Sequence, residues 1–359
     1  MGISKVVRAL FAGLLLVGPS LLAQAPAPSQ EPKTPADFTV TARYVLVPVT
    51  VTDSKGKFIN GLTQNDFSLY DNHKLQQITV DQGAHPVSLV VAIQQSAAME
   101  KILPQIQKTA SLYDGLVLGE AGEMAVIGFD HRIQTLTPFT SDPQKIAEAF
   151  KKLKSGSQAS HLDDAANEGI NMLRNREKNR KRILLLISES RDNGSEMRVK
   201  EVMTAAELND VVIFTVDVSH LMTSLTGRTE PNRPNPIPPQ ARPLPGGVIG
   251  SPTTDMQMEM GNWIPAIKEI FTATKAIFVK NPLEVFTKYS GGREYSFMTQ
   301  RSLEKAISDL GEEIQSQYLL TYKPNNTDEA GFHDVKVVVN KLDLTVRNRD
   351  GYWMAADYR

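Results

Sequence analysis

The chain contains the stretch Val87-Ser-Leu-Val-Val-Ala-Ile-Gln-Gln-Ser-Ala-Ala-Met99, an apolar run that passes directly into small polar residues. This run is too short to cross a bilayer, which needs about 20 apolar residues. A buried parallel strand that ends at the edge where open α/β sheets bind ligands has this pattern. The stretch therefore predicts a central strand of an α/β sheet, with a candidate site where the strand ends at Gln94.

Strand and helix patterns alternate from Val87 to Ser219. We expect strands at Leu89–Gln94, Glu123–Phe129, Arg132–Pro138, Arg182–Ser188 and Val211–Val218, and helices at Met99–Tyr113, Pro143–Leu153, Leu162–Lys178 and Met197–Asn209. This alternation predicts a doubly wound, mostly parallel, Rossmann-like sheet with helices on both faces. The short Phe129-Asp-His-Arg132 segment indicates a tight hairpin, so we expect one strand to be antiparallel.

Strands without helices occupy both ends of the remaining chain, from Phe38 to Asp81 and from Tyr318 to Arg347. We therefore expect the N- and C-terminal strands to form one small β-sandwich into which the α/β domain is inserted. The predicted divisions are a signal peptide at 1–25, a proline-rich linker at 26–37, sandwich segments at 38–85 and 316–359, and the α/β domain at 86–315 with a proline-rich loop at 225–260.

The N-terminus has the pattern of an export signal. Lys5 and Arg8 precede an apolar stretch, and Ala23-Gln-Ala25 offers small residues for cleavage. We therefore expect a secreted or periplasmic protein without a membrane span in its mature chain.

Composition excludes several classes of function. The chain has no cysteine, which excludes disulfides and thiolate chemistry. Its net charge of −1 gives no field that would attract nucleic acid. The one basic cluster, Arg174–Arg182, is expected at a solvated helix end, so no nucleic-acid partner is predicted.

Four strand-like motifs flank the α/β region: Val47-Pro-Val-Thr-Val-Thr-Asp53, Gly61-Leu-Thr-Gln-Asn-Asp-Phe-Ser-Leu-Tyr-Asp71, Tyr318-Leu-Leu-Thr-Tyr-Lys-Pro324 and Val346-Arg-Asn-Arg-Asp-Gly-Tyr352. Together they resemble the von Willebrand factor A-related domain family found in acidobacteria, over about Phe38 to Trp353. The resemblance implies a doubly wound α/β sheet in which three loops at the upper edge coordinate a divalent cation.

The residues at those loop positions depart from the family pattern. Its Asp-x-Ser-x-Ser falls on Gln94, Ser96 and Ala98, its threonine on Ser160, and its third-loop aspartate on Glu189. The resemblance therefore implies a degenerate metal-ion-dependent adhesion site.

Ligand chemistry argues against tight metal binding at these positions. Protein sites usually hold Mg²⁺ with one or two carboxylates, whereas Gln94 is a neutral amide, Ala98 has only a methyl group, and Glu189 is one methylene longer than aspartate. We expect no metal and no cofactor, and we expect Gln94, Ser96 and Ser160 to hydrogen-bond among themselves. Retention of Mg²⁺ or another divalent cation is the alternative.

The function expected from these features is a binding module that mediates protein–protein or matrix adhesion, with a protein or an extracellular-matrix or envelope component as partner. The sequence contains neither a His-Glu-x-x-His nor a Gly-x-Ser-x-Gly motif, so an enzyme is not expected. Two alternatives stay open: a serine-dependent hydrolase that uses Ser96 or Ser160, and a structural component of the cell envelope.

Overall fold

A computed structural model of the chain describes residues 44–219, 263–273, 279–297 and 299–354. All of them lie in one compact unit, Ala42–Arg359. The predicted signal peptide, the linker and the proline-rich loop at 225–260 lie outside the described residues. No helix among the described residues is long and apolar enough to cross a membrane.

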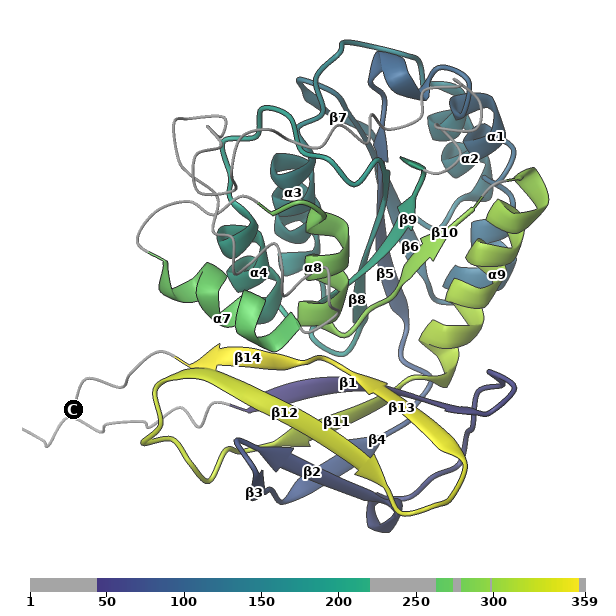
Figure 1. The fold of residues 1–359 in the computed structure, drawn as a ribbon. Helices are drawn as coiled ribbons and strands as arrows, with labels where there is room; N and C mark the ends of the chain where they lie inside the picture. Colours follow the sequence, from purple (N-terminus) through teal and green to yellow (C-terminus); the bar gives the residue numbers. More distant parts are fainter. Residues whose placement is uncertain (1–43, 220–262, 274–278, 298, 355–359) are drawn as a thin grey trace, which may run out of the picture. The chain divides into compact units, whose positions relative to one another are not determined.

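A six-stranded sheet forms the centre of the α/β region (Figure 1). Its strands, in spatial order, are β10 (Glu294–Ser296), β9 (Val211–Asp217), β8 (Lys181–Ser188), β5 (Val87–Gln94), β6 (Glu123–Phe129) and β7 (Ile133–Thr140). The neighbours from β10 to β6 are parallel, and β7 is antiparallel to β6. The predicted fold class and the hairpin are therefore confirmed, and β5 is buried along its whole length as its apolar run requires.

Helices cover both faces of this sheet (Figure 1). One apolar core packs against α3 (Leu162–Arg174), α4 (Val199–Leu208), α7 (Trp263–Thr272) and α8 (Pro282–Ser290). The other packs against α1 (Leu103–Gln107), α2 (Pro143–Lys151) and α9 (Gln300–Ser316).

The predicted helix Met99–Tyr113 is wrong in its extent. The structure has a 3₁₀ turn at Ala97–Met99, then the short α1, and then a π-helical turn at Asp114–Leu118. Pro104 lies in the first turn of α1. Proline has no N–H and its ring clashes with the carbonyl four residues earlier, so a helix can begin there but cannot pass through it.

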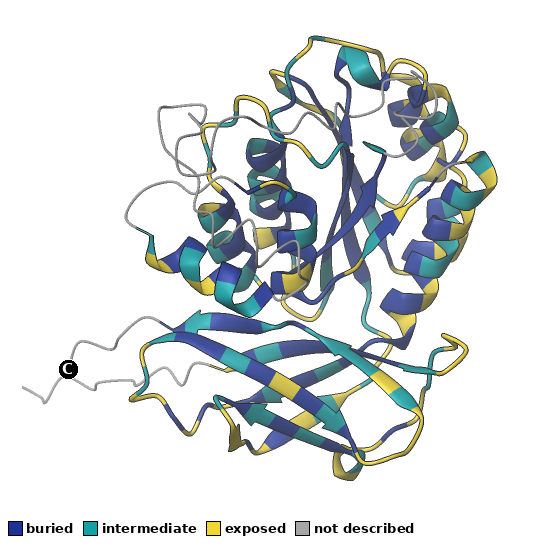
Figure 2. Ribbon diagram, viewed as in Figure 1, coloured by how far each residue is buried: buried dark blue, intermediate teal, exposed yellow. Residues whose placement is uncertain are grey.

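Two four-stranded antiparallel sheets make up the β-sandwich. One has the order β13-β1-β11-β4 and the other β14-β12-β2-β3. Their bounds are β1 (Val45–Asp53), β2 (Phe67–Asp71), β3 (Lys74–Leu75), β4 (Ile78–Asp81), β11 (Tyr318–Tyr322), β12 (Gly331–Val339), β13 (Leu344–Asn348) and β14 (Gly351–Met354), with a 3₁₀ turn at Gln64–Asp66. Apolar side chains from both sheets share one core, and alternate residues of β2 and β12 are buried (Figure 2).

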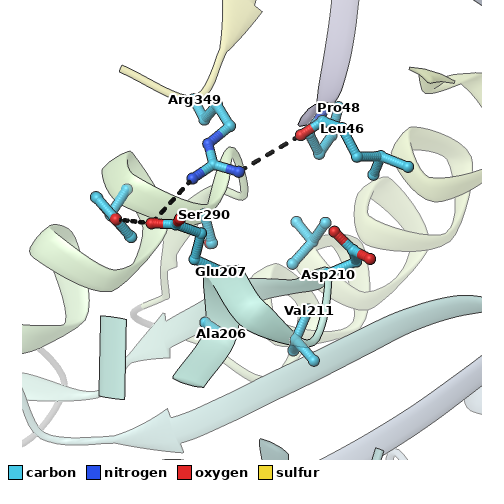
Figure 3. A pocket seen from close by; sticks show the side chains of 10 residues that line it. Leu46, Pro48, Ala206, Glu207, Asp210, Val211, Ser290 and Arg349 are labelled. Carbon is cyan, nitrogen blue, oxygen red and sulfur yellow. Dashed lines mark hydrogen bonds and ion pairs between the residues drawn. The ribbon is translucent and has the colours of Figure 1, made fainter. Parts of the chain in front are cut away.

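Two arginines of the sandwich contact buried glutamates of the α/β region. Arg347 pairs with the Glu313 carboxylate of α9, whose side chain is fully buried. Arg349 lies 3.9 Å from Glu207 of α4 and donates to the carbonyl oxygen of Leu46 (Figure 3). Because buried charges are costly unless they are paired, these contacts constrain how the two parts meet.

Candidate functional site

The candidate site forms where β5 and β8 end beside each other. These strands pair in parallel through Ile93 and Ile187, so the next residues, Gln94 and Ser188, leave the sheet at the same edge. Glu189 follows β8 directly, and Ser96 follows β5 by two residues. The topology therefore brings together side chains that are far apart in the sequence.

A closed set of hydrogen bonds joins three of the predicted residues. The Gln94 amide donates from Nε2 to Ser96 Oγ at 2.7 Å and to Glu189 Oε2 at 3.0 Å. The backbone N–H of Glu189 donates to Gln94 Oε1 at 2.8 Å. Gln94 is fully buried and Ser96 nearly so. The predicted bond between Gln94 and Ser96 is therefore confirmed.

The orientation of the Gln94 amide follows from its partners. The backbone N–H of Glu189 can only donate, so the side-chain oxygen of Gln94 must face it. If the Gln94 amide were turned over, its oxygen would instead face the Glu189 carboxylate and be repelled by it. The NH₂ group of Gln94 consequently points at the two oxygens that could otherwise bind a cation. A metal ligand must offer a lone pair, which the NH₂ group of Gln94 does not have.

Ser160 does not join this set, so that part of the hydrogen-bonding prediction is wrong. Its backbone forms an isolated bridge with Asn193, in which Asn193 N–H donates to the Ser160 carbonyl at 2.8 Å. Its hydroxyl is buried and has no hydrogen-bond partner among the described residues. Ala98 lies half-buried in the 3₁₀ turn after Ser96 and offers no polar side-chain atom.

Sequence reasoning missed Asp130, which holds the loop after β6. Its carboxylate accepts from the backbone N–H groups of Arg132 at 2.8 Å and Ser157 at 2.9 Å. Burial would raise the pKa of Asp130, but these N–H groups outweigh it and lower the pKa to about 2. A side chain at Gly156 would displace this carboxylate, because a Cβ would lie 2.4 Å from Asp130 Oδ2. The available signal in the sequence was that Asp130 directly follows a predicted strand and that a Gly-Ser pair occurs at Gly156 and Ser157.

Three acidic residues surround the start of α3. Asp192 Oδ1 accepts from Leu162 N–H at 2.9 Å and from the Ser195 hydroxyl at 2.6 Å, and Asp164 Oδ1 accepts from Met197 N–H at 2.8 Å. Their oxygens are thus occupied in loop and helix capping.

Asp163 behaves differently from the other two acids. Burial, together with the charges of Asp192 and Asp164, raises its pKa well above the usual range, and its Oδ1 has no hydrogen-bond partner among the described residues. The described residues contain no group of three or more His, Cys, Asp or Glu side chains placed to hold a metal ion.

The described part of the chain places no histidine beside either serine of the hydrolase alternative in a way that could activate it. The Ser96 hydroxyl accepts from Gln94, and the described hydrogen bonds include none between a serine and His161. His161 instead lies with its Nδ1 3.6 Å from Asp164 Oδ2. A serine nucleophile needs a base within hydrogen-bonding reach.

Comparison with known protein families agrees with the fold of the α/β region. Residues 89–191 match the family described as von Willebrand factor type A domain. The chain therefore contains a von Willebrand factor A-related domain over these residues. A search of the curated proteins found no match.

Solved structures with similar folds come from bacteria and from a mussel. BatB from Bacteroides thetaiotaomicron is 16% identical with a TM-score of 0.39, and the match covers 64% of this chain and 98% of that one. An aerotolerance-related membrane protein from Bacteroides fragilis is 12% identical with a TM-score of 0.39, covering 63% and 98%. Proximal thread matrix protein 1 from the mussel byssus, with a zinc-occupied metal-ion-dependent adhesion site, is 10% identical with a TM-score of 0.43, covering 68% and 50%.

Proposed function

We propose that this protein is a secreted or periplasmic adhesion module that binds a protein, matrix or envelope partner through the loops around Ser96, Ser160 and Glu189. One observation carries the proposal: Gln94 and Glu189 hold each other through two hydrogen bonds where the strands end. In this proposal, that pairing holds the two loops together without an ion. Rigid loops on a sheet edge are a usual platform for recognition.

We propose that partner binding here does not depend on a divalent cation. The NH₂ group of Gln94 donates to both Ser96 and Glu189, so those oxygens are already engaged. Recognition would then use exposed residues of the same loops, such as Lys154, Arg191 and Asn193.

We also propose that the protein is not an enzyme and binds no cofactor. Support comes from the two serines of the hydrolase alternative, neither of which has a histidine base as a hydrogen-bond partner among the described residues. The export pattern around Lys5 and Arg8 supports the secreted or periplasmic location.

Site-specific photo-crosslinking in the native cell envelope tests the proposal. A photoreactive side chain is placed at Lys154 or Asn193, both exposed on the candidate loops, and at Glu120 as a matched control, which is exposed just before β6 at the opposite edge of the sheet. We expect the same discrete adduct from both loop positions and none from Glu120, whether or not a chelator is present.

Three outcomes would contradict the proposal. An adduct that forms only from Glu120 would move the binding surface away from the loops. Loop adducts that disappear with chelator and return with Mg²⁺ would restore a metal-dependent site. Self-assembly without any heterologous adduct would favour the structural-component alternative.

A further inference from the structure

The β-sandwich carries an open groove of about 950 Å³ along one side. β4 is the last strand of its sheet, and β3 is the last strand of the other. The chain crosses from one sheet to the other at Gln76 and Gln77, between these two strands. Both residues line the groove, so strand edges of the two sheets border it.

Some backbone N–H and C=O groups at these strand edges have no partner strand within the residues that the structure describes. In the described part of the chain, β4 pairs only with β11, so alternate residues of Ile78–Asp81 direct their N–H and C=O groups outward. β3 pairs with β2 only at Tyr70 and Asp71, which leaves Phe67 and Ser68 beyond its end. The segment from Gln76 to Val80 contains no proline or lysine, the residues that commonly protect an edge strand.

The side chains of the groove are apolar or uncharged, with one exception. Tyr44 and Leu75 both line it and are 66% and 59% exposed, which is high for large apolar side chains. Among the described residues that line it, Lys323 alone is charged. A basic ligand would therefore be disfavoured, whereas an uncharged or acidic one fits.

We propose that this groove binds an extended peptide segment of a partner protein, which adds as a further strand to the edge of β4. Its backbone would pair with the free N–H and C=O groups of β4, and its apolar side chains would cover Tyr44 and Leu75. The alternate side chains of the segment are uncharged or acidic, in keeping with Lys323. The site is separate from the loops around Ser96 and does not rest on their function.

Hydrogen exchange and peptide titration test this assignment on the full chain. The probe is a short capped peptide in which valine alternates with threonine and glutamate. Its controls are the same peptide with lysine in place of glutamate, and the same peptide N-methylated at alternate residues. We expect the probe to slow amide exchange at alternate residues of Ile78–Asp81 by at least about tenfold, and both controls to lose this effect.

Two matched variants check the side-chain contribution. Leu75→Glu should weaken probe binding by about tenfold, because it removes an apolar contact and places a negative charge against the glutamate-bearing probe. Leu342→Glu should leave binding unchanged, since Leu342 is 91% exposed outside the groove. Equal weakening by both variants would overturn the proposal.

Three other results would also overturn it. No slowing of exchange in β4 at saturating probe would exclude strand addition. Concentration-dependent self-association that protects β4 would assign the edge to a second copy of this chain. Protection by a neutral oligosaccharide such as cellohexaose, but by no peptide, would assign the groove to a glycan.

Discussion

Glu189 and Gln94 bind each other at the carboxyl edge of the sheet: the N–H of Glu189 donates to Gln94 Oε1 at 2.8 Å, and Gln94 Nε2 donates to Glu189 Oε2 at 3.0 Å. The carboxamide can make both bonds because it is donor and acceptor at once. An aspartate at this position could accept from the N–H but would repel the Glu189 carboxylate.

The first prediction concerns Gln94→Asp. Without divalent cations we expect this variant to lose about 1–3 kcal/mol of unfolding free energy, because it removes a buried donor and places two carboxylates together. We expect added Mg²⁺ or Mn²⁺ to raise the melting temperature of this variant and to leave that of the native protein unchanged. Thermal unfolding with and without the cation measures both, with Gln94→Ala as the control that has no carboxylate. A cation-dependent rise in the native protein would contradict the prediction.

The second prediction compares two buried serines. Ser96→Ala should cost about 1 kcal/mol, because Gln94 Nε2 loses one acceptor. Ser160→Ala should be neutral or stabilising, because it removes a buried hydroxyl that has no partner in the described structure. Chemical denaturation of the two variants side by side gives the comparison. A larger loss at Ser160 would show that its hydroxyl has a partner in solution.

The third prediction concerns pH and the fully buried ion pair of His333 and Asp71, whose Nδ1 and Oδ1 atoms lie 2.6 Å apart. Burial would lower the pKa of His333, but the hydrogen bonds to Asp71 and to the Glu329 carbonyl outweigh it, so the pKa is raised from 6.5. A group whose pKa is higher in the folded than in the unfolded state stabilises the folded state fully when the pH is below its unfolded pKa. This stabilisation is lost as the pH rises through its folded pKa. Stability should therefore fall as the pH is raised above about 6.5.

The His333→Gln variant isolates this effect. It should lose about 3–5 kcal/mol at pH 6, because Asp71 remains buried without its cationic partner. It should also lose the decline above neutral pH. His73→Asn is the control, since His73 is exposed and forms no ion pair among the described residues. Urea denaturation across the pH range measures this effect. If stability still declined above neutral pH in the His333→Gln variant, the assignment would be contradicted.

The fourth prediction concerns Glu313, which is fully buried, pairs with Arg347 and accepts from the Tyr295 hydroxyl at 3.1 Å. Glu313→Gln should cost about 2–4 kcal/mol, because the half-buried Arg347 guanidinium loses its counter-charge. Asp309→Asn, which breaks the exposed pair with Lys305 on the same helix, should cost a few tenths of a kcal/mol. Urea denaturation measures both losses of unfolding free energy. Equal losses would show that the Glu313–Arg347 pair does not stabilise the contact between the sandwich and the α/β region.

The α/β sheet could be read from the sequence because it rests on local patterns. The apolar run that ends at Gln94 predicts β5, and Glu123–Phe129 is a strand with the expected bounds. Pro104 shows the limit of such patterns, since a residue without an N–H in the first turn of α1 separates this helix from the turn at Ala97–Met99.

Within the site, the sequence determined which chemical groups stand at the ends of the strands: an amide at Gln94, hydroxyls at Ser96 and Ser160, and a carboxylate at Glu189. It could not determine their partners. Glu189 rather than Ser160 meets Gln94, because parallel pairing brings the ends of β5 and β8 together while the Asn193 bridge fixes the Ser160 backbone. His333 and Asp71, and Asp130 beside Gly156, likewise meet only through packing. A hydrogen bond forms only when the donor–acceptor distance is right to within a few tenths of an ångström. Residues that are distant in the chain are placed with that precision only by the folded structure.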